Sequence, residues 1–271
     1  MWETIIIQPF INVLLIIYKY LGQNFGIAII LFTILIRLAT YPLTAKQMKS
    51  SKAMQDMNND PDWIKVQEKY KGDKEKLAQE QMKFYQEKGI SPFASCLPTL
   101  VQFPLILGLY QSVIRTMAQT PMQMFELTKF VYKGDFWFNT NLLPLNSKFL
   151  WMNLGQPDRL VLDFLPFAIP IMAIIVALTS YIQSRLITPP TSQPAAGASG
   201  QPDQTSQMSQ MMSIYMPLFM GYLAYTLASG LALYFVVGNL VGIAQYAIMG
   251  NAHWENVMFW KKPAPPEKRE K

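Results

Sequence analysis

Long apolar stretches separated by polar segments define this chain, and the apolar stretches are almost free of charge. Three windows carry at most one charged residue: Tyr20–Ala45, with only Arg37, Gly89–Ile114, and Phe164–Ser184. A fourth, Gln204–Asn251, carries none over 48 residues, enough for two membrane spans of about 20 residues each. The runs are continuous rather than alternating, which favours helices. We therefore predict five transmembrane helices, at about residues 23–44, 93–114, 164–185, 209–228 and 231–250, with a break at Ser229-Gly230 between the last two.

The first 20 residues have a different pattern. Thr4–Tyr18 is apolar but only 15 residues long, which is short for a span. Gln8, Asn12 and Lys19 fall on one stripe of a helix, as expected for a helix that lies in the membrane interface. Residues 1–20 are therefore predicted to form an interfacial amphipathic helix, and an additional span remains the alternative.

Composition supports an integral membrane protein. Hydrophobic residues make up 51% of the chain and charged residues 15%, whereas soluble domains contain about a quarter charged residues. The composition excludes a soluble enzyme, a disordered protein and a disulfide scaffold. Cys96 and His253 are the only cysteine and histidine, so neither a catalytic triad nor a metal site can be assembled and no cofactor is expected.

Lysine and arginine positions predict the orientation. Counting Arg185 at the end of the predicted third span, 16 of these residues lie on the side that holds residues 46–90, residues 186–208 and the C-terminal tail, against six on the other side. Because cytoplasmic loops carry the excess of positive charge, the C-terminus is expected in the cytoplasm and the N-terminus outside.

The loops differ in character. Residues 46–90 are predicted to form a cytoplasmic helical hairpin, because Asp60-Pro61 reads as a helix start and Gly72-Asp73 as a stop followed by a new start. A solvated linker is the alternative. The predicted spans lie within residues 21–45, 91–114 and 164–185, and the last two lie within 209–250. Between and after them we predict an extracytoplasmic loop at 115–163, whose aromatic residues suit the outer interface, and a flexible cytoplasmic loop at 186–208. Residues 251–271 are predicted to form a basic cytoplasmic tail. The tail either serves as a topology signal or contacts RNA or anionic lipid.

Arg37 is the most informative single residue. An arginine inside a span costs at least about 2.5 kcal/mol, so it is expected to face a bundle interior or a wet cavity. Thr33, Arg37 and Thr40 share one helix face. Snorkelling of Arg37 to the headgroups is the alternative.

Polar residues in the other spans can complete a hydrophilic groove around this arginine. The expected groove residues are Arg37, Thr33, Thr40, Gln102, Thr179, Gln183, Tyr234, Asn239 and Gln245. Each polar residue taken alone is more typical of a helix-packing hydrogen bond. No acidic residue lies deep in a predicted span, so a positive groove is expected to attract acidic or polar peptide segments and is poorly suited to a proton relay.

Several motifs, in combination and in order, resemble the YidC/Oxa1/Alb3 membrane protein insertases over nearly the whole chain. The motifs are Ile36-Arg37 with Tyr41-Pro42-Leu43, Glu68-Lys69-Tyr70-Lys71, Gly89-Ile90-Ser91-Pro92, Cys96-Leu97-Pro98 with Gln102 and Pro104, Trp151-Met152-Asn153-Leu154 with Gln156-Pro157-Asp158, and Ser229-Gly230-Leu231 with Tyr234 and Asn239. Phe235 departs from the family, which often has tyrosine there.

The resemblance implies an all-α integral membrane protein with five transmembrane helices, an N-terminal interfacial helix and a cytoplasmic helical hairpin, in which Arg37 is the groove arginine. It implies a short bacterial type in the plasma membrane that inserts newly made membrane proteins, is not an enzyme, and works with the ribosome, the Sec translocon, signal recognition particle or its receptor, and membrane lipids. A solute or ion transporter is the alternative function. The missing intramembrane acids and the absence of visible inverted repeats speak against it.

Overall fold

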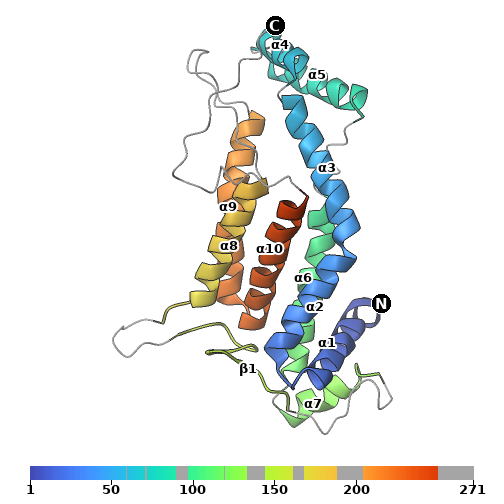
Figure 1. Ribbon diagram of the computed structural model, residues 1–271, viewed down its shortest axis with the longest axis vertical. Coiled ribbons are helices and arrows are strands. Elements are labelled where there is room, and N and C mark those ends of the chain that lie inside the picture. The colour runs from blue at the N-terminus through green and yellow to red at the C-terminus, as the bar shows by residue number, and fades with distance from the viewer. Residues whose placement is uncertain are drawn as a thin grey trace. The chain divides into compact units, whose positions relative to one another are not determined.

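The computed structural model describes residues 1–58, 60–70, 72–89, 97–118, 120–132, 144–160, 168–187 and 204–249. These residues are mostly helical, with one short two-stranded hairpin (Figure 1). The chain divides into two compact units, one made of Met1–Arg37 with Gly108–Lys271 and the other of Leu38–Leu107.

The first unit contains most of the helices. Its elements are η1 (Glu3–Ile7), α1 (Gln8–Tyr20), α2 (Phe25–Ala39) as far as Arg37, the second half of α6 (Leu97–Thr116), α7 (Pro121–Thr128), β1 (Lys148–Phe149), β2 (Met152–Asn153), α8 (Ile171–Ile187), α9 (Gln204–Thr226) and α10 (Ser229–Ile248). The strands pair antiparallel, with Lys148 opposite Asn153 and Phe149 opposite Met152.

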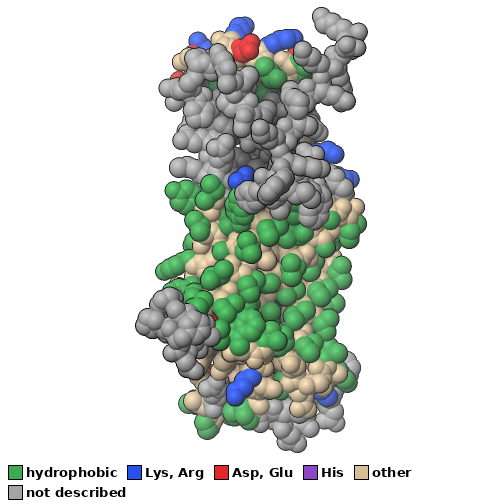
Figure 2. Space-filling view, turned by 60° about the vertical axis from the view of Figure 1, so that its left-hand side comes forward, with side chains coloured by type: hydrophobic (Ala, Val, Ile, Leu, Met, Phe, Trp, Pro, Cys, Tyr) green, Lys and Arg blue, Asp and Glu red, His purple; other side chains and the backbone are tan. Residues whose placement is uncertain are grey.

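Helices α8, α9 and α10 pack side by side (Figure 1). Gly221 lets α9 approach α8 closely, because a Cβ there would lie 3.0 Å from the Cβ of Ala177 and 3.4 Å from the Ala173 carbonyl. Figure 2 shows hydrophobic side chains spread over the face of α8 and α9. The exposed large apolar residues there are Ile174, Leu178, Ile214, Tyr215, Leu218, Phe219, Tyr222 and Tyr225. Such a surface suits contact with lipid.

The N-terminal helix packs antiparallel on α6. The Trp2 indole donates to Gln111 at 3.0 Å, and Ile6 lies against Gly108, further toward the start of α6. Asn12 is 1% exposed and joins α1 to the segment after α7, donating to the Phe130 carbonyl at 2.7 Å and accepting from the Tyr132 amide at 2.8 Å. The Asn12 amide, which sequence analysis placed on the polar stripe of an interfacial helix, is thus buried against backbone.

In the described part of the chain, two helices are long and apolar enough to cross a membrane: Glu3–Tyr20 and Ser229–Ile248. A third is obtained if Phe25–Ala39 and Tyr41–Ser50 form one bent span, and Ile171–Leu186 is a shorter apolar helix. The prediction of five spans and that of an interfacial placement for residues 1–20 both stay predictions.

Two helix boundaries differ from those expected. The predicted first span is interrupted at Thr40, between α2 and α3 (Tyr41–Asn58), because Pro42 has no N–H for the carbonyl of Leu38 and its ring crowds that carbonyl. The predicted break at Ser229-Gly230 was wrong by two residues, since the turn lies at 227–228. Ser229 and Gly230 already begin α10, and their amides bond to carbonyls of a distant loop.

The second unit contains α3, α4 (Pro61–Lys69), α5 (Lys74–Glu87) and the first half of α6. The Asp60 side chain caps α4 by accepting from the Asp62 amide, and Asp73 caps α5 by accepting from Lys76, as the sequence predicts. The two helices enclose a small core in which Trp63 is 1% exposed and stacks against Phe84, with ring centroids 5.6 Å apart. The cytoplasmic placement of this pair stays a prediction.

Candidate functional site

One face of α10 in the first unit gathers polar groups from α2. The Arg37 guanidinium, from the last turn of α2, rests on Gly238, where a Cβ would lie 2.8 Å from Nη2. About two turns further along α10, the side-chain amide of Gln245 donates to the Arg37 backbone carbonyl at 3.3 Å. The final carbonyls of a helix have no partner within it, so Gln245 supplies one from a neighbouring helix. Both the guanidinium and the backbone carbonyl of Arg37 therefore contact α10.

A second polar side chain reaches the same helix from α8. The side-chain amide of Gln183 lies against Gly242, one turn after Gly238. A Cβ at Gly242 would collide with the Gln183 Nε2. The side chains of Arg37 and Gln183 thus lie against two glycines that are one helical turn, about 6 Å, apart along the axis of α10.

Asn239 clasps α10 to α8. Its side-chain amide donates to the Thr179 hydroxyl at 3.0 Å and to the Ser180 hydroxyl at 2.8 Å. The Thr179 hydroxyl in turn donates to the Ile175 carbonyl of its own helix at 2.8 Å. The clasp fixes the register of α8 against α10, beside the glycine positions.

The remaining predicted groove residues are arranged differently. Thr33 is fully buried and its hydroxyl donates to the Ile29 carbonyl one turn earlier, so it is a packing residue in α2. Tyr234 is 2% exposed on α10, beside the ring of Phe235 at 5.8 Å. Thr40 and Gln102 belong to the second unit. Their membership of a common groove stays a prediction.

The polar side chains that gather on this face of α10, from α2, α8 and α10 itself, are suited to binding rather than to covalent chemistry. A guanidinium presents several N–H donors and a permanent positive charge, and a primary amide adds both donor and acceptor. Such a set suits carboxylates and peptide carbonyls. Within the described residues, no three His, Cys, Asp or Glu side chains come together as a metal site would require.

A loop at the far end of the unit holds the first turns of α8 and α10. Asp158 is 4% exposed and accepts from the Met172 amide of α8 at 2.8 Å and from the Trp151 indole at 3.2 Å. The amides of Ser229 and Gly230 donate to the carbonyls of Gln156 and Leu154 at 2.8 and 3.0 Å. These bonds satisfy donors that helix starts leave open.

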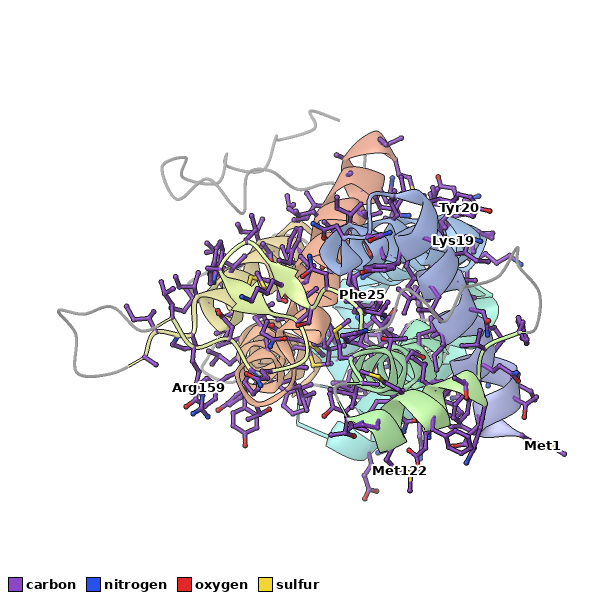
Figure 3. All side chains as sticks on the ribbon, turned by 90° about the horizontal axis from the view of Figure 1, so that it is seen from below. Met1, Lys19, Tyr20, Phe25, Met122 and Arg159 are labelled. Carbon is purple, nitrogen blue, oxygen red and sulfur yellow. The ribbon has the colours of Figure 1, made fainter. Side chains whose placement is uncertain are left out.

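This end of the unit is also hollowed. An open pocket of about 410 Å³ is lined by Trp151, Met152, Asn153, Gln156, Pro157, Asp158 and Arg159. Figure 3 looks onto this end and shows Arg159 and Lys19 pointing outward on different sides, with Phe25 inside. The pocket is distinct from the polar face of α10, because none of its lining residues lies on α10.

Electrostatics in the second unit centre on Asp60 and Lys88, which join the start of α4 to the end of α5. The Lys88 ammonium lies 2.9 Å from an Asp60 carboxylate oxygen. This hydrogen bond, with one from the Asp62 amide, lowers the pKa of Asp60 below its ordinary value, and the same carboxylate raises the pKa of Lys88. Burial raises the pKa of Tyr85, which lies in the small core.

Comparison with known proteins identifies the family. The model of the 60Kd inner membrane protein family matches residues 16–256. Membrane protein insertase YidC 2 of Bacillus anthracis is 34% identical over 254 residues, which are 92% of this chain and 81% of that protein. The chain belongs to the YidC family. Membrane protein insertase MisCA of Bacillus subtilis (strain 168) is 32% identical over 248 residues, 90% of this chain and 77% of that protein.

The fold also resembles that of a solved YidC. A crystal structure of active YidC insertase with its first transmembrane domain resolved matches with a TM-score of 0.50 and 22% identity. The match covers 92% of this chain and 46% of the solved chain, so this chain spans about half the length of that protein. The likeness shows a shared fold.

Sequence reasoning missed several residues that the structure brings into these sites. Gly238 and Gly242 seat the polar side chains on α10, and Ser180 receives half of the Asn239 clasp. The spacing of four between the two glycines was a readable signal for a shared face. Asp158, quoted as part of a YidC motif, was not expected to cap a helix, because Met172 lies 14 residues away.

Proposed function

We propose that this protein is a membrane protein insertase of the bacterial plasma membrane, which inserts newly made membrane proteins and helps them fold. The observation that carries the proposal is 34% identity to a membrane protein insertase over 92% of the chain. The seating of an intramembrane arginine on α10 supports it, because an arginine in a span is expensive and marks a functional site.

The proposed topology has five spans, with the N-terminus outside and the C-terminus in the cytoplasm. Residues 1–20 lie at the outer interface, residues 46–90 form the cytoplasmic hairpin, and residues 251–271 form a cytoplasmic tail. Support comes from the bias of lysine and arginine between the two sides of the chain.

The proposed mechanism uses a hydrophilic groove that opens to the cytoplasm and to lipid and is closed on the outside. Its residues are Arg37, Thr33, Thr40, Gln102, Thr179, Gln183, Tyr234, Asn239 and Gln245. A polar extracytoplasmic segment of a client enters the groove partway, attracted by the charge of Arg37. This shortens the hydrocarbon path that the polar segment must cross.

The client's apolar helix then leaves sideways into lipid along α8 and α10. Its transfer is driven by burial of its own apolar surface, at about 25 cal/mol per Å². No nucleotide or covalent step is required. The hydrogen bonds from Asn239 of α10 to Thr179 and Ser180 of α8 support the proposal that this pair forms one wall of the groove.

The proposed partners are nascent membrane proteins, the ribosome, the Sec translocon, signal recognition particle or its receptor, and membrane lipids. The second unit offers a polar docking surface, because α4 and α5 carry ion pairs such as Lys65–Asp62 and Lys83–Glu80 on exposed faces. Exposed pairs of this kind contribute little to stability and are available to a partner.

Reconstitution of the purified full-length protein into lipid vesicles tests the function. A single-span client with a polar N-terminal tail is synthesised against these vesicles, and protease protection of the tail measures insertion. We expect protected tails in loaded vesicles and not in empty ones. Equal protection in both would overturn the proposal, and efflux of trapped solutes without client insertion would favour a transporter.

A further inference from the structure

The glycines of α10 fall into two kinds, which differ in what occupies the space where a Cβ would be. At Gly230 the nearest atoms are the Leu154 backbone carbonyl oxygen and the Val113 Cγ1, both at 3.0 Å, and on α9 the glycine at 221 faces backbone and Cβ atoms of α8. These are places where backbones approach closely. At Gly238 and Gly242 the nearest atoms are the ends of long polar side chains.

The space above Gly238 is filled by the Arg37 guanidinium. A Cβ there would lie 2.8 Å from Nη2, 3.4 Å from Nε and 3.5 Å from Cζ, so the guanidinium covers the glycine from one side. The Gln245 bond holds the Arg37 backbone carbonyl at 3.3 Å on the same helix. Because the Arg37 backbone is fixed and Gly238 has no side chain, the guanidinium can lie directly against α10 at this position.

The space above Gly242 is filled by the Gln183 amide, whose Nε2, Cδ and Oε1 are all near the absent Cβ. The neighbouring Asn239 clasp fixes α8 beside α10, so the root of Gln183 is held as firmly as that of Arg37. Glycine is a poorer helix former than alanine, and two glycines one turn apart weaken α10. In return, the two glycines leave room against α10 for the side chains of Arg37 and Gln183.

We propose that Gly238 and Gly242 are positioning residues that seat the Arg37 guanidinium and the Gln183 amide on α10 as a two-point donor for a client's polar segment. The inference rests on the proposed insertase function and deepens it. The guanidinium supplies the charge that favours acidic segments, and the amide supplies a neutral donor about one helical turn away that suits a backbone carbonyl.

Alanine substitutions at these glycines distinguish an effect on the position of the polar side chains from an effect on the stability of the protein. The displaced atoms in Gly238→Ala and Gly242→Ala are ends of flexible side chains, so the helix is expected to stay folded while these ends move. If the guanidinium moves from about 8 to about 10 Å from a client carboxylate, the Coulomb attraction between them weakens. At an effective dielectric of about 20, this lowers the occupancy of the carboxylate about twofold.

The test compares variants of the full-length protein in lipid vesicles, with two clients that differ only in an acidic or a neutralised tail. We expect Gly238→Ala to lower the acidic-to-neutral insertion ratio at least about twofold, and to have no effect on that ratio in an Arg37→Ala background. Gly242→Ala is expected to slow both clients equally, and to add nothing in a Gln183→Leu background. Thermal unfolding of Gly238→Ala and Gly242→Ala, expected at or above the wild-type midpoint, is measured alongside.

Gly221→Ala is the matched control, because it is also a helical glycine of this unit but faces α8 backbone and Cβ atoms rather than polar side chains. It is expected to lower the unfolding midpoint and leave the insertion ratio unchanged. An unchanged ratio in Gly238→Ala, while Arg37→Ala lowers it, would overturn the positioning role alone. An unchanged ratio in Arg37→Ala would overturn the proposed electrostatic function and this inference with it.

Discussion

The side-chain amide of Gln245 donates to the backbone carbonyl of Arg37 at 3.3 Å, across 208 residues of sequence. The bond joins the last turn of α2, which carries the Arg37 charge, to α10. Because Gln245 is 7% exposed, water competes little for this carbonyl. The position of Arg37 therefore depends on α10 through its backbone as well as through its guanidinium.

Asn239→Leu is expected to loosen α8 from α10 without unfolding the protein. The change removes two interhelical hydrogen bonds, each worth about 0.6 kcal/mol in membrane proteins, so the free energy of unfolding should fall by about 1 kcal/mol. The Thr179 hydroxyl keeps its bond to Ile175 and is not stranded. Denaturant unfolding in mixed micelles measures the change.

The control for the clasp is the double variant Thr179→Val with Ser180→Ala, which removes the partners instead of Asn239. In that background Asn239→Leu should have little further effect, because the same bonds are already absent. Full additivity of the two losses would show that Asn239 acts through other contacts.

Asp158→Ala is expected to release the first turn of α8. The variant loses an acceptor for the Met172 amide and for the Trp151 indole, together with a negative charge at a helix start, at a cost of about 1–3 kcal/mol. Hydrogen exchange of the Met172 amide should speed up, while the middle of α8 stays protected.

Asp158→Asn serves as the milder variant. Its side-chain oxygen can still accept from Met172, but its NH2 group meets the Trp151 donor. Exchange at Met172 should lie between the wild-type and alanine rates. Wild-type exchange in Asp158→Ala would mean that another group caps α8.

Local signals allowed the starts of α4 and α5 in the second unit to be predicted. Asp60-Pro61 and Gly72-Asp73 each contain, within two residues, the acceptor and the backbone constraint that start or stop a helix. Trp63 and Phe84 follow the helical period on each side, so the burial of Trp63 and the partial burial of Phe84 against it could be expected once the two helices were placed.

The polar face of α10 could be predicted only in part. Arg37, Asn239 and Gln245 stand out because polar residues in apolar spans need partners, but which partner each finds depends on how α2, α8 and α10 pack. The Gln183–Gly242 contact joins residues 59 positions apart and leaves no local pattern. The same applies to the break before α10, where carbonyls of Leu154 and Gln156 determine which residue starts the helix.

Acid is expected to open the start of α4 before it unfolds the rest of the second unit. The Lys88 ammonium lowers the pKa of Asp60 below 3.8, so the stabilisation is fully present above the unfolded-state value of about 3.9. It is lost as the pH falls through the lower folded-state pKa. Protection factors of the first-turn amides of α4, measured between pH 2 and pH 6, should decline over that window.

Asp60→Asn is the control, because its amide still accepts from the Asp62 backbone but does not titrate. Its protection factors should be lower than wild type at pH 6 and flat at more acidic pH. A decline of the same size in Asp60→Asn would assign the acid response to another carboxylate.

Arg37→Ala is expected to slow insertion of clients with acidic extracytoplasmic tails much more than that of clients with neutral tails. A client carboxylate about 8 Å from the guanidinium, at an effective dielectric of about 20, gains roughly 2 kcal/mol, which is about a thirtyfold bias in occupancy. Arg37→Lys keeps the charge and should retain most of this bias. The measurement is protease protection of paired acidic and neutralised clients in vesicles.

Folding of each Arg37 variant is checked first by thermal unfolding, because the guanidinium also fills the space above Gly238 and its loss leaves a gap between α2 and α10. A packing defect slows both clients alike, whereas loss of charge changes their ratio. Arg37→Met, which fills much of the gap without charge, separates the two effects. If Arg37 only anchors its helix at the headgroups, Arg37→Met and Arg37→Ala will slow acidic and neutral clients equally, and the electrostatic role is then wrong even though insertion is impaired.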